Sequence, residues 1–154
     1  MNFSGVLQYV NLYGLAILLV IMVPNIIYAG KYPENFENLW RNKFVEMLEQ
    51  IGRFGCFGFM IVILPWFKFG FASGKIFAAY LIADGILLFL YCAVWVIYFN
   101  KNTLFRAIAL SVLPSLLFLT SGILTAYLPL AVSACIFAPC HVLISVKNCI
   151  LQNK

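Results

Sequence analysis

The longest uncharged stretch of the chain constrains its fold more than any other feature. Residues 107–146 contain no Asp, Glu, Lys or Arg, and most of them are apolar. A single helix of this length would measure roughly 60 Å, about twice the hydrocarbon core of a bilayer. We therefore expect two helices, over residues 103–126 and 128–146. The chain should reverse near Tyr127 and Pro129, because proline both ends and begins helices.

Three further apolar runs precede this stretch. Each is about as long as the ~20 residues that a helix needs to cross a bilayer, and they cover residues 6–28, 45–66 and 76–99. None of them alternates with the period of two that is typical of a membrane β-barrel. The sequence therefore predicts an all-α fold, in which residues 1–154 form a single transmembrane domain, a bundle of five transmembrane helices.

The polar segment between the first two runs predicts one additional, shorter helix. Phe36, Trp40, Phe44 and Met47 recur at intervals of three or four residues, so they share one face of a helix. Polar side chains occupy the opposite face. We expect an interfacial amphipathic helix over about residues 35–50 that leads into the second span. It either anchors that span or serves as a gate or a docking helix for a partner.

Composition and charge narrow the class of protein. Hydrophobic residues make up 64% of the chain and charged residues only 10%, against about 25% charged residues in a soluble domain. These values exclude a soluble enzyme and a disordered chain, and leave too few basic side chains for a nucleic-acid-binding surface. Eight of the ten basic residues fall on one side if the N-terminus lies outside. The positive-inside rule therefore predicts a multi-pass cell-membrane protein, embedded in the lipid bilayer, with a cytoplasmic C-terminus.

Asp84 is an acidic residue placed deep within a predicted span. Tyr80, Tyr91 and Trp95 fall on the same helical face at 100° per residue, and Asn11 of the first span lies at a similar depth. A carboxylate among aromatic rings can hold a desolvated cation. We expect these five residues to form a ligand-binding pocket. In the alternative interpretation, Asp84 is structural and bonds to a neighbouring helix.

A second polar layer is expected at the cytoplasmic end of the bundle. Glu49 and Arg53 are four residues apart on one helix and should form an ion pair. Arg106 should pair with Glu49 or Glu46, or extend toward the membrane surface. His141 is the only histidine; it either titrates near neutral pH or is a satisfied packing residue.

The sequence contains no motif of a known catalytic centre. Neither HExxH, GxSxG nor a phosphate-binding loop occurs, and we expect no cofactor. Cys140 and His141 are adjacent and would point about 100° apart on a helix, which disfavours a shared metal. Gly52, Gly55 and Gly58 predict close packing on a neighbouring helix or on another copy of the chain.

Three function classes remain. The leading one is binding or transport of a small ligand, a cation or a lipid-like molecule, at the intramembrane polar pocket. The alternative is a structural or accessory subunit, which forms a homo-oligomer or packs within a larger membrane complex. An intramembrane enzyme is the third class, and the absence of motifs argues against it.

Four stretches of the sequence resemble a group of small multi-pass membrane proteins from low-GC Gram-positive bacteria. The stretches are residues 11–14 (NLYG), 23–29 (VPNIIYA), 48–56 (LEQIGRFGC) and 138–141 (APCH). The resemblance extends over most of the chain. It implies a bacterial plasma membrane as the setting and assigns no functional residue.

Overall fold

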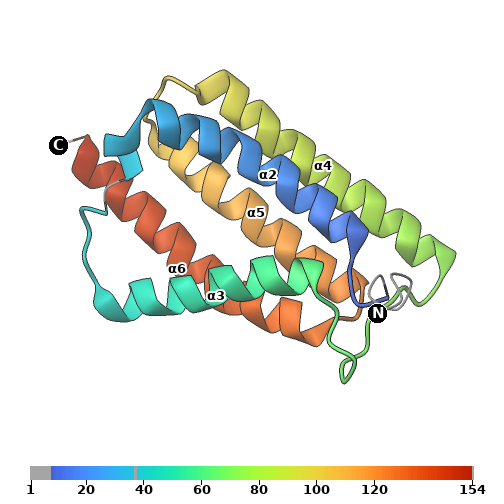
Figure 1. Ribbon diagram of the computed structural model, residues 1–154. Coiled ribbons are helices and arrows are strands. Elements are labelled where there is room, and N and C mark those ends of the chain that lie inside the picture. The colour runs from blue at the N-terminus through green and yellow to red at the C-terminus, as the bar shows by residue number, and fades with distance from the viewer. Residues whose placement is uncertain (1–7, 37, 154) are drawn as a thin grey trace.

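The computed structural model describes residues 8–36 and 38–153 and is all-α over them (Figure 1). Its elements are α2 (Leu12–Lys31), the short 3-10 helix η1 (Pro33–Phe36), α3 (Lys43–Ile61), α4 (Gly74–Tyr98), α5 (Leu104–Leu124) and α6 (Leu128–Gln152). The predicted all-α class is confirmed for this part of the chain, whereas the five predicted crossings and the interfacial helix are not. The start of the predicted span 6–28 and residue 37 of the predicted interfacial helix lie outside the described residues.

Four of these helices are long and apolar enough to cross a membrane, namely α2, α4, α5 and α6. They identify the chain as a helical integral membrane protein of the multi-pass type. The remaining long helix, α3, has 19 residues and carries four charges, on Lys43, Glu46, Glu49 and Arg53. α3 is long enough to cross a membrane, but its charged residues set it apart from these four helices.

The start of α3 differs from the prediction. The sequence pattern places a helix from about residue 35, whereas residues 38–42 are not helical and α3 begins at Lys43. Asn42 sets this boundary, because its side chain accepts a hydrogen bond from the backbone N–H of Val45 at 3.3 Å. Glu46 in turn accepts one from the backbone N–H of Asn42 at 3.0 Å. This reciprocal cap outweighs the apolar periodicity further upstream.

The long uncharged stretch forms a helical hairpin. α5 ends at Leu124 and α6 begins at Leu128, with a proline in the first turn of α6. The break falls where Tyr127 and Pro129 predict it. Gly122 lets the two helices approach closely, since a Cβ atom there would lie 2.7 Å from the backbone nitrogen of Ala131.

α3 crosses α6 at a second close approach (Figure 1). A Cβ atom at Gly52 would lie 2.6 Å from the backbone nitrogen of Phe137, and one at Gly55 would collide with the hydroxyl of Ser133. These two glycines therefore pack on a neighbouring helix of the same chain, one of the two options that the sequence left open. Gly58 has open space around it.

Hydrogen bonds join three elements at one end of the bundle, which we call the closed end. The backbone N–H of Asn11, just before α2, donates to the carbonyl of Ile61 at the end of α3, at 2.7 Å. The fully buried hydroxyl of Tyr127 accepts from the N–H of Leu64 and donates to the carbonyl of Val62, both at 3.0 Å. The start of α2, the end of α3 and the α5–α6 turn are thereby held together.

Candidate functional site

The opposite end of the bundle contains a polar cavity of about 740 Å³, and we call it the open end. Side chains from α2, α3, α5 and α6 line this cavity, with Trp95 of α4. All five members of the predicted cytoplasmic polar cluster line it: Glu46, Glu49, Arg53, Arg106 and His141. The polar lining also includes Lys43, Tyr28, Ser111, Ser145 and six carboxamides: Asn25, Asn38, Gln50, Asn102, Asn148 and Gln152.

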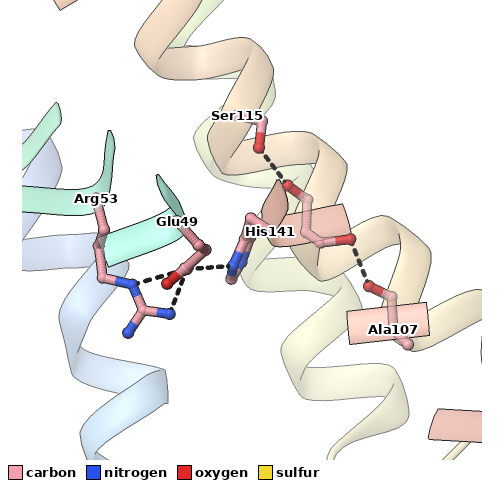
Figure 2. A network of polar contacts seen from close by, with 6 residues as sticks. Glu49, Arg53, Ala107, Ser115 and His141 are labelled. Atoms are coloured by element: carbon pink, nitrogen blue, oxygen red, sulfur yellow. Dashed lines mark hydrogen bonds and ion pairs between the residues drawn. The ribbon is translucent and has the colours of Figure 1, made fainter. Parts of the chain in front are cut away.

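Glu49 is the most buried charged group of this cavity. Only 2% of its surface is exposed, and two basic side chains converge on it from different helices (Figure 2). Arg53, one turn further along α3, donates from Nε at 3.0 Å and from Nη2. Nδ1 of His141 on α6 lies 2.9 Å from the same carboxylate oxygen. The predicted Glu49–Arg53 pair is confirmed, and the buried carboxylate has a basic side chain on each side.

His141 is fixed in turn by the helix on which it lies. Its ring stacks on that of Phe137, one turn earlier in α6, with 4.5 Å between the ring centroids. Phe137 is also the residue against which Gly52 packs. The α3–α6 crossing therefore sets the distance between Glu49 and His141.

Ser111, which lines the cavity, and Ser115, one turn further along α5, both donate their hydroxyl protons to carbonyls of their own helix. Ser111 donates to the carbonyl of Ala107 and Ser115 to the carbonyl of Ser111, each at 2.7 Å (Figure 2). Such back-bonding occupies the hydroxyl proton. These hydroxyls are consequently not free to donate to a ligand in the present arrangement.

Arg106 lies in the first turn of α5 and is 6% exposed. Its Nη1 donates to the hydroxyl of Tyr28 at 3.0 Å and to the carbonyl of Lys101 at 3.3 Å. The guanidinium carbon lies 4.1 Å from the ring centroid of Tyr28 and 4.9 Å from that of Trp95. Two aromatic rings thus hold this cation through cation–π contacts.

Of the two arrangements predicted for Arg106, the pair with a glutamate is not found. The ion pairs found among the described residues are those of Glu49 with Arg53 and His141, and none includes Arg106. Glu46 is occupied elsewhere, since it accepts hydrogen bonds from Asn38 and from the start of α3. Arg106 is therefore a buried cation that borders a polar cavity without a carboxylate partner in the described part of the chain.

Asp84 lies nearer the closed end and is bound by α5. It is 1% exposed and accepts hydrogen bonds from the hydroxyls of Thr120, at 2.8 Å, and Ser121. Asp84 does not line the polar cavity, and neither do Tyr80 and Asn11. The contacts of Asp84 are those that the structural alternative requires.

The other residues of the predicted Asp84 pocket are buried and fall into two groups. Tyr80 lies with Asp84 and Asn11, whereas the rings of Tyr91 and Trp95 meet edge to face, with 6.4 Å between their centroids. Tyr80, Tyr91 and Trp95 lie on the buried face of α4 together with Asp84, as their spacing predicts. Tyr91 receives a hydrogen bond from Asn25 of α2 at 2.6 Å, and Trp95 packs against Arg106 at the open end. The structure therefore does not gather this helix face around one pocket.

Sequence reasoning missed most of the uncharged polar residues of the cavity. Asn38, Asn102, Asn148, Gln50 and Gln152 all line it. Each falls near the cytoplasmic end of a predicted span, so the concentration of carboxamides there was the available signal. Tyr28 was missed as well, because its contact with Arg106 joins positions 78 residues apart.

An apolar pocket of about 300 Å³ adjoins the polar cavity. The two share four lining residues: Asn25, Arg53, Leu110 and His141. The rest of the pocket is formed by apolar and aromatic side chains of α2, α3, α4, α5 and α6: Ile21, Met22, Ile26, Ala29, Phe57, Tyr91, Pro114, Phe118 and Phe137.

Comparison with protein-family models, with curated protein sequences and with solved structures finds no match. Within residues 8–36 and 38–153 there is no group of three or more His, Cys, Asp or Glu side chains that could hold a metal ion. The candidate site therefore rests on the geometry of the open end.

Proposed function

We propose that this membrane protein binds a small anionic ligand in the polar cavity of its open end. The observation that carries the proposal is Arg106, a buried guanidinium group beside a cavity of about 740 Å³. Cavities of this size are typical of small-molecule sites. Guanidinium groups are well suited to carboxylates and phosphates, because their N–H groups form a planar fork.

The charges that line the cavity favour an anion. Three basic residues, Lys43, Arg53 and Arg106, face two acidic ones. Glu49 is compensated by Arg53 and His141, whereas Arg106 lacks a carboxylate among the described residues. A ligand with a negative charge would complete the electrostatic balance.

The Asp84 face offers less support for a ligand site. Both carboxylate oxygens of Asp84 already accept hydroxyl hydrogen bonds from Thr120 and Ser121. A cation there would compete with these bonds in a contact that is 1% exposed. The open end therefore supports ligand binding better than the Asp84 face does.

We further propose that α3 is a fifth membrane crossing. Its 19 residues measure about 28 Å at 1.5 Å per residue, close to the roughly 30 Å of a hydrocarbon core. Successive contacts follow α6 in antiparallel order, from Glu49 with His141 to Gly52 with Phe137. The charged half of α3 faces the cavity, where Glu49 is paired.

The distribution of basic residues supports a cytoplasmic open end and an external N-terminus. Lys31 ends α2, Lys43 begins α3, Lys101 precedes α5, and Lys147 lies in the last turns of α6. All four belong to the open end, as the positive-inside rule favours. The setting that we propose is a bacterial plasma membrane, which the resemblance of the sequence implies.

An exposed face of the three α3 glycines, Gly52, Gly55 and Gly58, would favour the accessory-subunit alternative. Of the three, Gly58 alone has open space around it. Gly52 and Gly55 are covered by α6 of the same chain.

Thermal unfolding of the detergent-purified protein tests the proposed function. A ligand that binds only the native state stabilises it in proportion to RT ln(1 + [L]/Kd). We expect phosphatidylglycerol or glycerol phosphate, used as anionic probes, to raise the unfolding midpoint of the wild type and of the Lys75→Gln control. Lys75 lies outside the cavity lining, at the start of α4. Arg106→Gln should lose the rise.

Two results would overturn the proposed function. One is that neither probe raises the midpoint of the wild type. The other is that the rise persists unchanged in Arg106→Gln, which would show that the probe binds elsewhere. Arg106→Lys separates charge from shape, because lysine keeps the charge without the planar fork; it should retain only part of the rise.

A further inference from the structure

We infer that the ligand is an anionic lipid, with its phosphate-bearing headgroup in the polar cavity and its hydrocarbon chain in the adjoining apolar pocket. This inference rests on the proposed function and adds the ligand class. The juxtaposition of a polar and an apolar chamber with four shared residues carries it. A molecule that fills both chambers must be polar at one end and apolar at the other.

The polar chamber contains the groups that bind a phosphate and its substituents. Arg106 has five N–H donors, and the described contacts use Nη1 alone. Lys43 lines the same cavity at the start of α3 and is exposed. Carboxamides such as Gln50 and Asn148 can donate to phosphate oxygens and accept from hydroxyl groups. This set recognises a phosphate diester with polar substituents.

The apolar chamber matches a hydrocarbon chain. Its volume is about 300 Å³, and its lining includes Met22, Phe57, Phe118 and Phe137. Ile26 lines this chamber while 63% of its surface is exposed, so the chamber reaches the outer surface of α2. Around an integral membrane protein that surface contacts lipid.

The arrangement of α2 and α3 provides a lateral route between this chamber and the bilayer. The two helices are joined at the closed end, where Asn11 bonds to Ile61. They diverge toward the open end (Figure 1), and the apolar chamber is lined by Met22 and Ile26 of α2 and by Phe57 of α3. A lipid could therefore place its headgroup in the polar cavity and one chain in the apolar chamber, while its other chain remains in the hydrocarbon layer. A free phosphate ion has no apolar part that would occupy this opening toward the bilayer.

The same geometry disfavours a zwitterionic headgroup. A quaternary ammonium group requires an aromatic face or an unpaired carboxylate. Arg106 already covers the rings of Tyr28 and Trp95. Of the two carboxylates in the lining, Glu49 is paired with Arg53 and His141, and Glu46 accepts hydrogen bonds from Asn38 and from the start of α3. We therefore expect selectivity for phosphatidylglycerol over phosphatidylcholine with identical acyl chains.

Native mass spectrometry of the full chain in detergent tests the inference by titration with dioleoyl phosphatidylglycerol and dioleoyl phosphatidylcholine. We expect the phosphatidylglycerol complex to have an affinity at least about tenfold higher, the effect of one charge-assisted contact. Glycerol phosphate, followed by thermal shift, should bind at least about 100-fold more weakly than the lipid, because it buries no methylene groups.

A matched pair of variants tests the apolar chamber. Ala29→Phe fills the chamber at a residue that does not line the polar cavity, and should lower the affinity for phosphatidylglycerol about tenfold. Its control, Ala78→Phe, makes the same change at an exposed position of α4 and should leave the affinity unchanged. The thermal midpoint reports whether each variant folds, and Ala29→Leu replaces Ala29→Phe if the latter does not.

The outcomes distinguish this inference from the proposed function. If glycerol phosphate binds as tightly as phosphatidylglycerol and Ala29→Phe has no effect, the ligand is a soluble anion and the lipid inference is overturned, while the proposed function stands. Equal affinities for the two lipids also overturn it. If no probe shows binding that Arg106→Gln abolishes, the proposed function fails too.

Discussion

The two ends of the bundle both bury polar side chains, yet they satisfy them in different ways. At the closed end, the carboxylate of Asp84 receives hydrogen bonds from Thr120 and Ser121, and Tyr127 makes two bonds to backbone groups. At the open end, Arg106 is held by rings and a hydroxyl, beside a large cavity. A buried polar residue in a membrane helix therefore indicates a ligand site only where the protein leaves its hydrogen bonds or charge incompletely matched.

One helix accounts for the difference between the ends. The last residues of α3 bond to the start of α2, and Gly52 brings the middle of α3 against α6. The first turns of α3 lie on the far side of this crossing, where Lys43, Glu46 and Glu49 face the cavity. The oblique packing of α3 on α6 thus accounts both for the hydrogen-bonded closed end and for the cavity at the open end.

Gly52→Ala should give the largest effect of the substitutions that test this comparison. Its new Cβ atom would lie 2.6 Å from the backbone of Phe137, so α3 must move away from α6. We expect a loss of about 3 kcal/mol in the free energy of unfolding, at the upper end of the usual cost of overpacking. Thermal or denaturant unfolding in detergent measures it.

Gly58→Ala is the matched control, since a Cβ atom there meets open space. It should be neutral or stabilise α3 by up to about 1 kcal/mol, the usual gain of alanine over glycine in a helix. Equal effects of the two substitutions would show that the α3–α6 crossing does not depend on Gly52.

Asp84→Leu should have the next largest effect and should act on stability alone. It removes the acceptor for Thr120 and Ser121 in a contact that is 1% exposed, and such losses cost about 1–3 kcal/mol. Asp84→Asn keeps one acceptor oxygen and should cost less than Asp84→Leu. Stability is read from unfolding curves and function from phosphatidylglycerol titration. Loss of lipid binding in a folded Asp84→Asn protein would contradict a structural role.

The smallest effect is expected for the coupling between Glu49 and Arg53. The side chain of Arg53 is 39% exposed, so solvent weakens the pair, and His141 still faces Glu49 after Arg53 is removed. A double-mutant cycle of Glu49→Gln and Arg53→Leu should give a coupling energy of about 0.5–1 kcal/mol. Strict additivity of the two changes would exclude the pair as a stabilising contact.

The sequence predicts those features that depend on neighbouring positions along the chain. The break at Tyr127 and Pro129 follows from the length of the uncharged stretch, and the Glu49–Arg53 pair follows from their spacing. The start of α3 was also encoded locally, by Asn42 and Glu46, but the apolar periodicity upstream obscured this signal.

The features that escaped prediction depend on contacts between distant segments. Arg106 lies against Tyr28 and Trp95 rather than a glutamate, because α5 begins beside the ends of α2 and α4. Helical periodicity places Asp84 and Trp95 on one face of α4. It does not show that Asp84 contacts α5 whereas Trp95 lines the polar cavity. Only the packing of helices decides which buried polar groups remain incompletely matched.

The most direct test of this account compares Arg106→Gln with Asp84→Asn in one titration with phosphatidylglycerol. Both substitutions remove an ionisable group from a buried side chain, one at each end of the bundle. The account predicts that Arg106→Gln lowers the affinity at least about tenfold, as expected for the loss of a hydrogen bond to a charged group, and that Asp84→Asn leaves it unchanged. An equal loss in both variants, or a loss in Asp84→Asn alone, would contradict the assignment of ligand binding to the open end.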